Sequence, residues 1–585
     1  MIQTQNVHLQ FANYFNDKEM LPYFYLLSKK LAEGSICLNL NQIDWEKLKE
    51  EENGLTNYRL LSMDELKKNE FVSDENLKKP LVLLNNRLYF QRYFQYETAV
   101  LTKILALVKK EISEKSQSDL FQIKTEVQEI FKENSTKKTD WQAVAAISAV
   151  LNRFSIITGG PGTGKTTTLA KVLSLLYKIQ PEMKVALAAP TGKAAQRMAD
   201  SLKNSATQFP DVKSKFEELQ PSTLHRLLGF KKNSIYFKHT AENPLPHDLI
   251  IVDESSMIDL ALFSKLLSAV QASARLILLG DKNQLASVEA GSLFGDLCMA
   301  QESLNIFSKK RADFINDFLV SPTSKIKETH IQNSSHPLFE HIIELQHSFR
   351  FDEKSGIGTF SKAVIENQTD VLRSFFKDHN EQVKIDSDYS ETVFKNFAEH
   401  YVDYTEEKDI KTALKKLNNQ RVLCAVKEGE EGVYALNRNV ENYLHKKGKI
   451  VLGSEFYENR PLMVTSNNYE LGLYNGDVGI VRNGKVWFES SEKNQDLKSV
   501  LPAFLENVET VFAMSIHKSQ GSEFDKVLTV LPQKSDVAIL TAELLYTAVT
   551  RAKKEVIIQG SEEVLLQCVA KRVERSSGIM ERFPQ

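Results

Sequence analysis

A glycine-rich segment in the first third of the chain has the residue types that hold a polyphosphate. Residues 159–166 read Gly-Gly-Pro-Gly-Thr-Gly-Lys-Thr and follow the apolar run Phe154–Ile157. Glycines let backbone N–H groups turn toward a phosphate, and the start of a following helix adds partial positive charge. Lys165 supplies a charge for the β- and γ-phosphates, and the Thr166 hydroxyl a ligand for Mg²⁺. A glycine turn without nucleotide is rare at this spacing, so a nucleoside triphosphate site is predicted over Gly159, Gly160, Pro161, Gly162, Thr163, Gly164, Lys165, Thr166 and Thr167.

Two further apolar runs end at polar residues that suit phosphate chemistry. Leu249–Val252 is followed by Asp253 and Glu254. In P-loop enzymes one acid at this place completes the Mg²⁺ shell and a second can orient the attacking water. Asp253 is therefore the predicted metal ligand and Glu254 the general base, although two solvated acids would also end a strand. Leu276–Leu279 leads to Gln284. Gln284 is predicted to sense the γ-phosphate or to hold the attacking water, although a turn residue that satisfies local backbone groups would fit this stretch equally well.

These residues need a scaffold that brings strand ends together. Apolar strands that each end at a polar loop, with helical stretches between them, indicate an α/β fold with a parallel sheet and its site at the carboxyl ends. Further along, the strand-like Thr510–Ala513 and the helical stretch Leu544–Ala552 indicate a second sheet-containing domain. The helical stretch would deliver Arg551 toward a nucleotide held by the first domain.

Length and composition fit a large globular protein. The chain has 585 residues, enough for three or four domains, and its 74 basic residues are balanced by 76 acidic ones. This balance argues against a nucleic-acid coat protein or a membrane-surface binder, but not against a local basic groove. The four cysteines have no metal-type spacing, and no signal peptide or long apolar run is visible. The sequence therefore predicts a soluble, cytoplasmic protein with no membrane segment.

Seven segments occur in the order of the superfamily 1 helicase motifs, and the chain resembles the RecD family, the alpha subunits of the RecBCD enzyme. The segments are Gly159–Thr166, Ala189–Ala195, Val252–Met257, Gly280–Gly291, Ser348–Phe351, Ile516–Phe524 and Tyr546–Ala552. The resemblance implies two RecA-like P-loop motor domains that use ATP and Mg²⁺. It also implies movement 5′ to 3′ along single-stranded DNA.

The resemblance adds roles around the nucleotide. Gln142 matches the glutamine that reads the adenine edge, and Glu523 would accept a ribose hydroxyl. Arg350 and Arg551 match the two arginine fingers that stabilise charge on the γ-phosphoryl group. A finger contributes about 10³- to 10⁵-fold in rate, whereas a surface salt bridge, the alternative for either arginine, contributes about 1 kcal/mol or less.

The resemblance also implies a path for single-stranded DNA. Hydroxyls and amides directed at phosphates, together with base stacking, allow a nearly neutral chain to track a strand. His517 is alternatively a structural histidine. The chain has Lys282-Asn283 where many relatives carry an arginine and an aspartate, so the contacts of that loop are open. The implied DNA-binding residues are Thr191, Lys193, Ser222, Thr223, His225, Ser515, His517 and Lys518.

The same reading divides the chain into parts. Residues 1–110 are expected to form a small, mostly α partner-docking domain, and residues 111–138 a helical linker. Residues 139–345 would be the first motor domain, with a small hairpin near 229–247 that is either a duplex-splitting pin or a plain surface hairpin. Residues 346–585 would be the second motor domain. Alternating apolar residues and Asn-Gly and Gly-Asp turns near 455–510 predict an SH3-like β insertion in it.

Three functional readings follow. In the first, the chain is the helicase subunit of a complex that repairs double-strand breaks, acting on single-stranded DNA and duplex ends beside RecB-like and RecC-like subunits. In the second it is a stand-alone helicase of the same family, although the long N-terminal extension of stand-alone relatives is not evident. In the third it is a nucleotide-regulated scaffold that unwinds nothing. No carboxylate–lysine cluster typical of a nuclease is present, so DNA cleavage is expected only in a partner.

Overall fold

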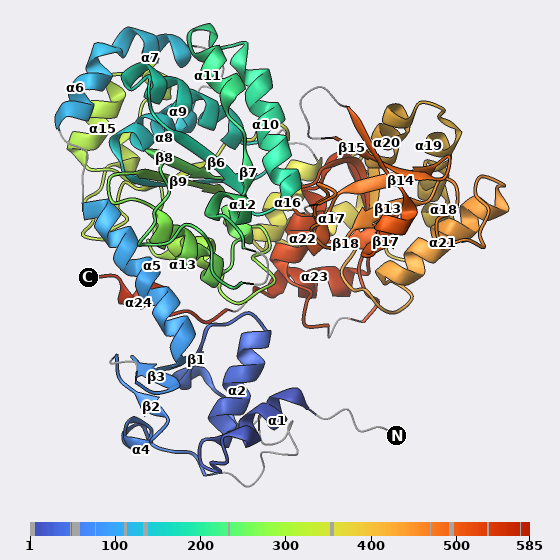
Figure 1. Cartoon of the computed structure of the whole chain (residues 1–585), viewed down its shortest axis with the longest axis horizontal. Coiled ribbons are helices and arrows are strands. Elements are labelled where there is room, and N and C mark those ends of the chain that lie inside the picture. Colours follow the sequence, from blue (N-terminus) through green and yellow to red (C-terminus); the bar gives the residue numbers. More distant parts are fainter. Residues whose placement is uncertain are drawn as a thin grey trace.

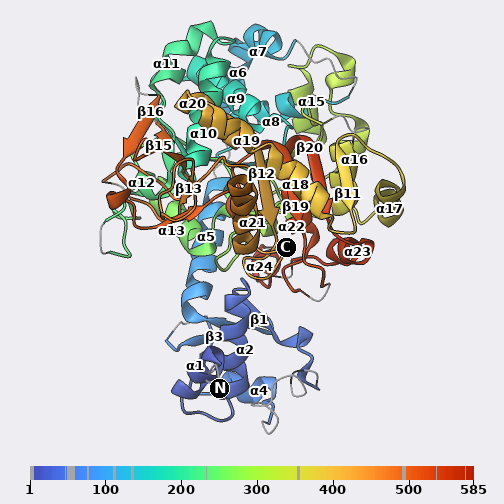
Figure 2. The same cartoon turned by 90° about the vertical axis from the view of Figure 1, so that its right-hand side faces the viewer.

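The computed structural model describes residues 6–46, 48, 59–75, 78–109, 114–132, 138–231, 234–351, 356–468, 470–490, 496–534, 537–573 and 575–584. Two α/β lobes lie side by side, and a smaller N-terminal domain lies below the first of them (Figure 1). The same separation of the small domain from the lobes is visible from the side (Figure 2). No helix in these ranges is long and apolar enough to cross a bilayer.

The N-terminal domain combines helices with a sheet that the sequence analysis did not predict. Its helices are α1 (Val7–Tyr14), α2 (Leu21–Ala32) and α4 (Met63–Lys68). Its sheet has the order β1-β4-β3-β2 and consists of β1 (Cys37–Asn39), β2 (Val72–Ser73), β3 (Leu81–Leu84) and β4 (Arg87–Phe90). Asn85 and Asn86 join β3 to β4 with φ values of 48° and 59°, the backbone of a tight two-residue hairpin turn. The domain that was expected to be mostly α thus also contains a four-stranded sheet.

Three helices connect this domain to the first lobe. Helix α5 (Gln91–Lys109) runs from the end of β4 and packs along α13 (Leu260–Ala269) of the lobe. Its buried side chains Val100, Leu101 and Ile104 belong to the apolar core of that lobe. Helices α6 (Glu114–Gln122) and α7 (Lys124–Ile130) follow. The described part of the connection is therefore mostly helical, and α5 is anchored to the lobe by apolar packing.

The first lobe is built on a six-stranded parallel sheet with the order β10-β5-β9-β8-β6-β7. Ile156 and Ile157, adjacent in β5, belong to two different apolar clusters, so both faces of the sheet are covered, as parallel sheets require. The strands are β5 (Phe154–Gly159), β6 (Val185–Ala189), β7 (Ser222–Thr223), β8 (Leu249–Val252), β9 (Arg275–Gly280) and β10 (Ile342–Leu345). The covering helices are α8 (Trp141–Leu151), α9 (Lys165–Ile179), α10 (Gly192–Ala206), α11 (Lys213–Glu218), α12 (Leu224–Leu228), α13, α14 (Leu293–Met299) and α15 (Lys309–Asn316).

The predicted hairpin near 229–247 has a different form. The chain reverses direction there, and Lys238 N donates to Gly229 O over 2.9 Å while His239 N donates to Leu228 O over 2.9 Å. None of the described residues in this stretch forms a strand. Ile235 and Tyr236 at its tip are 68% and 70% exposed. The segment is a loop with an apolar tip rather than a β-ladder.

The second lobe contains a five-stranded parallel sheet with the order β11-β20-β19-β12-β18. This confirms the second sheet-containing domain. The strands are β11 (Val383–Asp386), β12 (Gln420–Cys424), β18 (Ala513–Ser515), β19 (Phe524–Val530) and β20 (Ala552–Gln559). The helices are α16 (Gly356–Ile365), α17 (Thr369–Lys377), α18 (Glu391–Glu399), α19 (Val402–Glu406), α20 (Ile410–Asn418), α21 (Val433–Lys446), α22 (Ala542–Val549) and α23 (Glu562–Ala570).

A separate antiparallel sheet is inserted into the second lobe. It has the order β16-β15-β14-β13-β17 and its own apolar core. The strands are β13 (Pro461–Val464), β14 (Val478–Arg482), β15 (Lys485–Glu489), β16 (Leu497–Val500) and β17 (Val508–Thr510). Asn483 and Gly484, with φ values of 52° and 71°, form the turn between β14 and β15. An all-β insertion therefore lies where the turn signals indicated it, and its likeness to an SH3 barrel stays a prediction.

The C-terminal segment leaves the second lobe and lies against the other two parts. Helix α24 (Ile579–Arg582) packs on α14 and α5, where it lies beside α5 in Figure 1. Arg582 Nη1 donates to the buried Glu97 of α5 over 2.8 Å. Ile36 N in the N-terminal domain donates to Ser576 O over 3.0 Å. Residues 575–584, which the sequence analysis assigned to the second motor domain, thus tie the N-terminal domain to the first lobe.

Candidate functional site

A cavity of about 780 Å³ lies between the two lobes and is lined by residues of both. It brings together thirteen of the predicted nucleotide-site residues, which come from distant parts of the chain. Gly159, Gly160 and Thr163 of the phosphate loop are not in its wall. The predicted residues that line it are Gln142, Pro161, Gly162, Gly164, Lys165, Thr166, Thr167, Asp253, Glu254, Gln284, Arg350, Glu523 and Arg551.

The phosphate loop requires glycine at two positions. Gly162 and Gly164 have φ values of 78° and 82°, in the left-handed region that L side chains rarely adopt. A Cβ at Gly164 would lie 2.2 Å from Gln142 Nε2, and one at Gly162 would lie 2.3 Å from Arg350 Cβ. The loop is thus shaped by backbone and packed between two other predicted site residues. Lys165, the first residue of α9, donates from Nζ to Gly159 O over 2.6 Å and to Gly160 O over 3.2 Å.

The two carboxylates after β8 lie in unequal environments. Burial and the charge of Glu254 raise the pKa of Asp253 to about 6, although Lys165 opposes the shift. The backbone N of Glu254 donates to Asp253 Oδ1 over 2.8 Å. Glu254 itself has φ 51° and ψ 39°, a left-handed conformation that costs a non-glycine residue on the order of 1–3 kcal/mol. Such strain is often found at functional sites, and the role of Glu254 as general base stays a prediction.

A hydrogen-bonded group after β9 joins the two lobes. Gln284 Nε2 donates to Asp281 Oδ2 over 3.0 Å, and the Tyr546 hydroxyl of α22 donates to the same oxygen over 3.1 Å. Leu285 N donates to Thr547 Oγ1, also in α22, over 3.0 Å. Burial raises the pKa of Asp281. Gln284 Oε1 is buried without a hydrogen-bond partner and is available to a water or ligand in the cavity.

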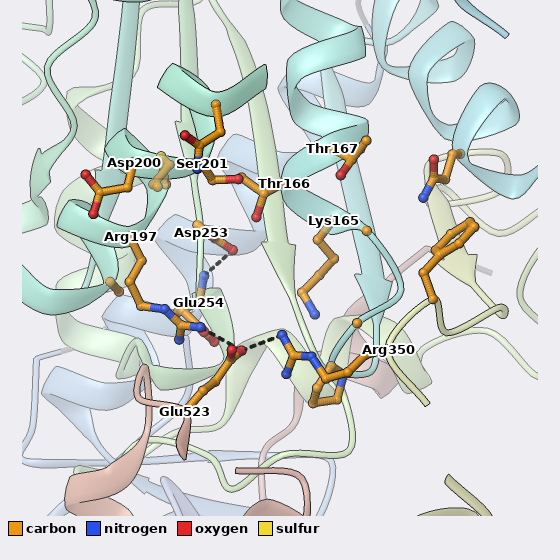
Figure 3. A pocket seen from close by; sticks show the side chains of 18 of the residues that line it. Lys165, Thr166, Thr167, Arg197, Asp200, Ser201, Asp253, Glu254, Arg350 and Glu523 are labelled. Atoms are coloured by element: carbon orange, nitrogen blue, oxygen red, sulfur yellow. Dashed lines mark hydrogen bonds and ion pairs between the residues drawn. The ribbon is translucent and has the colours of Figure 1, made fainter. Parts of the chain in front are cut away.

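Three arginines and one glutamate meet at the wall opposite Lys165. Arg350 Nη2 lies 2.8 Å from Glu523 Oε1, and Arg197 Nη2 lies 2.6 Å from the same oxygen. Figure 3 shows Glu523 between these two guanidinium groups, with Lys165 and Asp253 facing them. Burial opposes ionisation of Glu523, but the two arginines outweigh it and lower the pKa of Glu523 to about 2. Arg551 is almost fully buried and donates to Thr547 O and Ser522 O over 3.2 Å each.

Gln142 and an aromatic ring mark another part of the wall. Gln142 Nε2 donates to Thr163 O over 3.1 Å, and Lys171 Nζ donates to Gln142 Oε1 over 3.1 Å. Burial lowers the pKa of Lys171. Phe349 also lines the cavity and is 60% exposed. An amide beside an open aromatic face suits a purine base, which presents both hydrogen-bonding edges and a ring to stack.

Two smaller cavities hold most of the predicted DNA-binding residues. One, of about 240 Å³, is lined by Thr191, Lys193, His517 and Lys518. The other, of about 430 Å³, is lined by Lys193, Ser222 and Thr223 and by the β insertion. Two predicted residues line neither: His225 packs on Phe237 with ring centroids 5.7 Å apart, and the Ser515 hydroxyl accepts from Lys518 N over 3.3 Å.

Several residues of these sites were not identified from the sequence. Arg197 is four residues after Lys193 in α10, and this helical spacing was its only signal. Phe349 precedes Arg350 directly, so an aromatic beside a predicted finger was the available signal. Asp281 and Tyr546 lie within the matched segments Gly280–Gly291 and Tyr546–Ala552, but their contact joins two lobes and no local pattern indicates it.

The fold and the residues of the cavity together show which class of protein this chain belongs to. Each lobe is built on a parallel sheet, and one cavity lies between the lobes. The first lobe supplies a phosphate loop to this cavity, and the second lobe supplies Arg350 and Arg551. A family model described as "AAA domain" matches residues 142–290, and one described as "UvrD-like helicase C-terminal domain" matches residues 510–559. The chain is a superfamily 1 helicase with two RecA-like motor domains.

The similarities to whole proteins identify the family within that class. "RecBCD enzyme subunit RecD, N-terminal domain" matches residues 5–89. RecBCD enzyme subunit RecD of Haemophilus influenzae is 34% identical over 86% of this chain and 80% of its own length. The Mycobacterium tuberculosis protein of that name is 36% identical over 76% of this chain and 73% of its own. The chain belongs to the RecD subunit family. Among solved structures, the Pif1 helicase from Bacteroides in complex with ADP-AlF3 and ssDNA is 16% identical over 75% of this chain and 93% of its own, with a TM-score of 0.33.

Replacing Asp253 tests the electrostatics of the carboxylate pair. The folded state raises the pKa of Asp253 from 3.8 to about 6, so the ionised side chain lowers the free energy of unfolding. This loss of stability is complete above pH 6 and disappears as the pH falls toward 3.8. We expect Asp253→Asn to stabilise the nucleotide-free protein by up to about 3 kcal/mol at pH 8, and clearly less at pH 5. The measurement is the thermal midpoint at both pH values.

The control is Asp525→Asn, which removes a carboxylate that pairs with the exposed Lys554 over 2.7 Å. It should give no stabilisation at either pH. A lower thermal midpoint for Asp253→Asn at pH 8 would contradict the assigned environment.

Proposed function

We propose that this chain is the ATP-dependent helicase subunit of a RecBCD-type complex and moves 5′ to 3′ along single-stranded DNA during repair of double-strand breaks. The observation that carries the proposal is the cavity shared by the two lobes, which has Lys165 on one side and Arg551 on the other. A nucleotide held there would touch both lobes, so its binding and hydrolysis can change how they sit together. The domain boundaries, the cytoplasmic location and the individual roles below remain predictions.

The first lobe would bind the nucleotide. The backbone of the phosphate loop and Lys165 hold the phosphates, while Gln142 and Phe349 hold the base. Thr166 and Asp253 fit a Mg²⁺ ion, since both line the cavity and the pKa of Asp253 is raised beside a second carboxylate, which a cation would relieve. A bound Mg²⁺ would neutralise the β- and γ-phosphate oxygens. In the described part of the chain no three His, Cys, Asp or Glu gather as a metal site, so phosphate and water oxygens would complete its shell.

Hydrolysis would use residues of both lobes. Glu254 is held by its strained backbone so that its carboxylate can accept a proton from the attacking water. Gln284 has a free, buried amide oxygen that can orient the same water. Arg350 and Arg551 would stabilise the charge that develops on the γ-phosphoryl group. Because Gln284 and Tyr546 share one carboxylate oxygen of Asp281, a change at the γ-phosphate can reach the second lobe through hydrogen bonds.

Movement along DNA requires that each lobe holds the strand in turn. Lys193 on the first lobe and Lys518 on the second line the same small cavity, so a strand passing through it would touch both lobes. Phosphate-directed contacts of this kind carry no sequence preference. The loop 472–478 of the β insertion lines the neighbouring cavity and would contact the strand as well.

The partners follow from the family. The relatives named RecBCD enzyme subunit RecD are subunits by name, and we propose that this chain also joins RecB-like and RecC-like subunits and binds them through its N-terminal domain. Nuclease activity is expected only in a partner. A stand-alone helicase is the alternative, since the ATP-dependent RecD2 DNA helicase of Deinococcus radiodurans is 27% identical over 74% of this chain. Co-purification with two larger chains separates these readings.

Strand displacement by the purified chain, alone and with its partners, tests the function. Substrates carry a 5′ or a 3′ single-stranded tail. We expect ATP-dependent unwinding from the 5′ tail and ATP hydrolysis that single-stranded DNA stimulates. Arg551→Ala should lower the hydrolysis rate by about 10³-fold or more, and Lys554→Ala, which removes an exposed charge nearby, should not.

A different result would contradict each part of this proposal. Unwinding only from the 3′ tail would reject the polarity. Hydrolysis that DNA does not stimulate would favour the scaffold reading. A loss of less than about tenfold in Arg551→Ala would reject its role as a finger.

The pH dependence of DNA binding tests Lys193. Burial, together with the charges of Arg421 and Arg197, lowers the pKa of Lys193 to about 8. The charged form is present below that pH and is lost above it, so the affinity for single-stranded DNA should fall by about tenfold between pH 7 and pH 9 at low salt. An arginine stays charged over this pH range, so the Lys193→Arg protein should not show this loss of DNA affinity. An equal pH dependence in both proteins would exclude Lys193 from the DNA path.

A further inference from the structure

Glu523 is an acidic side chain that pairs with two arginines in the wall of the cavity between the lobes. Its Oε1 accepts from Arg350 and forms an ion pair with Arg197, at 2.8 Å and 2.6 Å, and its Oε2 lies 3.9 Å from Lys553. Its side chain is only 15% exposed. All of these groups except Lys553 line the nucleotide cavity. One carboxylate therefore pairs with two arginines at the wall that faces the phosphate loop (Figure 3), and Lys553 lies outside that wall.

Carboxylates and phosphates compete for arginine because both offer oxygen pairs that match the guanidinium fork. The two ion pairs keep Glu523 ionised, with a pKa of about 2. Arg350 is only partly used by it: Nη2 is bonded to Glu523, whereas Nη1 is buried without a partner. A second anion in the cavity could thus bind Arg350 and draw it away from the glutamate.

The same contact joins the lobes. Glu523 precedes β19 of the second lobe, and Arg197 belongs to α10 of the first. Arg197 also donates from Nη1 to Gly521 O over 2.9 Å. Through these bonds the segment 521–523 is held against α10 at the edge of the nucleotide cavity. An anion that displaced Glu523 would release this part of the second lobe.

We propose that the Glu523 carboxylate takes the place of the γ-phosphate in the nucleotide-free enzyme. Glu523 binds Arg350 and Arg197 in that state and must release both arginines when a triphosphate binds. This inference rests on the proposed function, and it replaces the ribose-binding role that the family resemblance implies for Glu523. Glu523 is on this account a positioning residue. The Glu523 carboxylate lowers the affinity for a triphosphate, and it binds the two arginines again after the γ-phosphate has left.

Competition between Glu523 and the γ-phosphate would affect ATP and ADP differently. A competitor for Arg350 and Arg197 opposes only ligands that need these arginines, so it should weaken the binding of a triphosphate and leave ADP almost unaffected. A ribose ligand would instead strengthen both nucleotides equally, since both carry the same sugar.

The test is the affinity of the full chain for ADP and for a non-hydrolysable ATP analogue, measured by calorimetry without DNA. In Glu523→Gln we expect about tenfold tighter binding of the ATP analogue, because the neutral amide competes less strongly for the two arginines than the carboxylate does, and less than a twofold change for ADP. Glu523→Asp keeps the charge but shortens the reach, and it should shift the ATP analogue in the same direction by a smaller factor. Glu523→Gln should also raise hydrolysis in the absence of DNA.

Asp525→Asn is the matched control: it removes a carboxylate two residues away that pairs with Lys554 at the surface, and it should change neither affinity. Unchanged or weaker binding of the ATP analogue in Glu523→Gln would overturn the inference, and equal weakening of ATP analogue and ADP would assign Glu523 to the ribose. If Glu523→Gln does not fold, the direction of the shift in Glu523→Asp decides in the same way. Because this readout needs only nucleotide binding, a wild-type chain that binds ATP but unwinds no DNA would reject the motor function without deciding the role of Glu523.

Discussion

The structure depends on the balance of charge in the cleft between its two lobes. Lys165, Arg197, Arg350 and Arg551 all line one cavity, and cations gathered in a partly buried space repel each other unless acceptors surround them. Here Glu523 satisfies two of them and backbone carbonyls satisfy the others. A cleft lined by these four cations is suited to bind a polyanion such as a triphosphate. Because the acceptors come from both lobes, any ligand that replaces them alters the contact between the lobes.

A second set of contacts joins the two lobes through hydrogen bonds rather than ion pairs. Asp281 accepts from Tyr546, Leu285 N donates to Thr547, and the Gln520 side chain donates to Leu285 O over 2.6 Å. These bonds connect the loop after β9 with α22 and with Gln520, which lines one of the cavities that hold predicted DNA-binding residues. If the proposed nucleotide and DNA sites are correct, this short stretch of chain would couple them.

Much of the fold was predictable because the buried parallel strands are continuous apolar runs that end at functional residues. Leu249–Val252 is β8 without change, and β5 and β9 contain the predicted runs. The N-terminal sheet was missed since its strands of two to four residues are too short to show alternation. Contacts such as that of Arg197 with Glu523 join residues far apart in the chain, and the sequence contains no local signal for them.

The candidate site was likewise predictable where its residues are close in the sequence and not where they are far apart. Glycines and Lys165 were identified because a phosphate loop needs fixed spacing within a few residues. The role of Glu523 could not be read in this way, since its partners are fixed by the packing of α10 against the second lobe. Resemblance gave it a ribose contact, whereas the geometry surrounds it with arginines. The family pattern thus located the residue, and only the three-dimensional arrangement showed its contacts with Arg350 and Arg197.

The most direct test of the account is a crystal structure of the chain with a non-hydrolysable ATP analogue and Mg²⁺. The account predicts Lys165 Nζ and the Arg551 guanidinium on opposite sides of the same β- and γ-phosphates, each within about 3 Å of a phosphate oxygen. A nucleotide bound to Lys165 alone, with Arg551 still bonded to Thr547 O and Ser522 O, would contradict it.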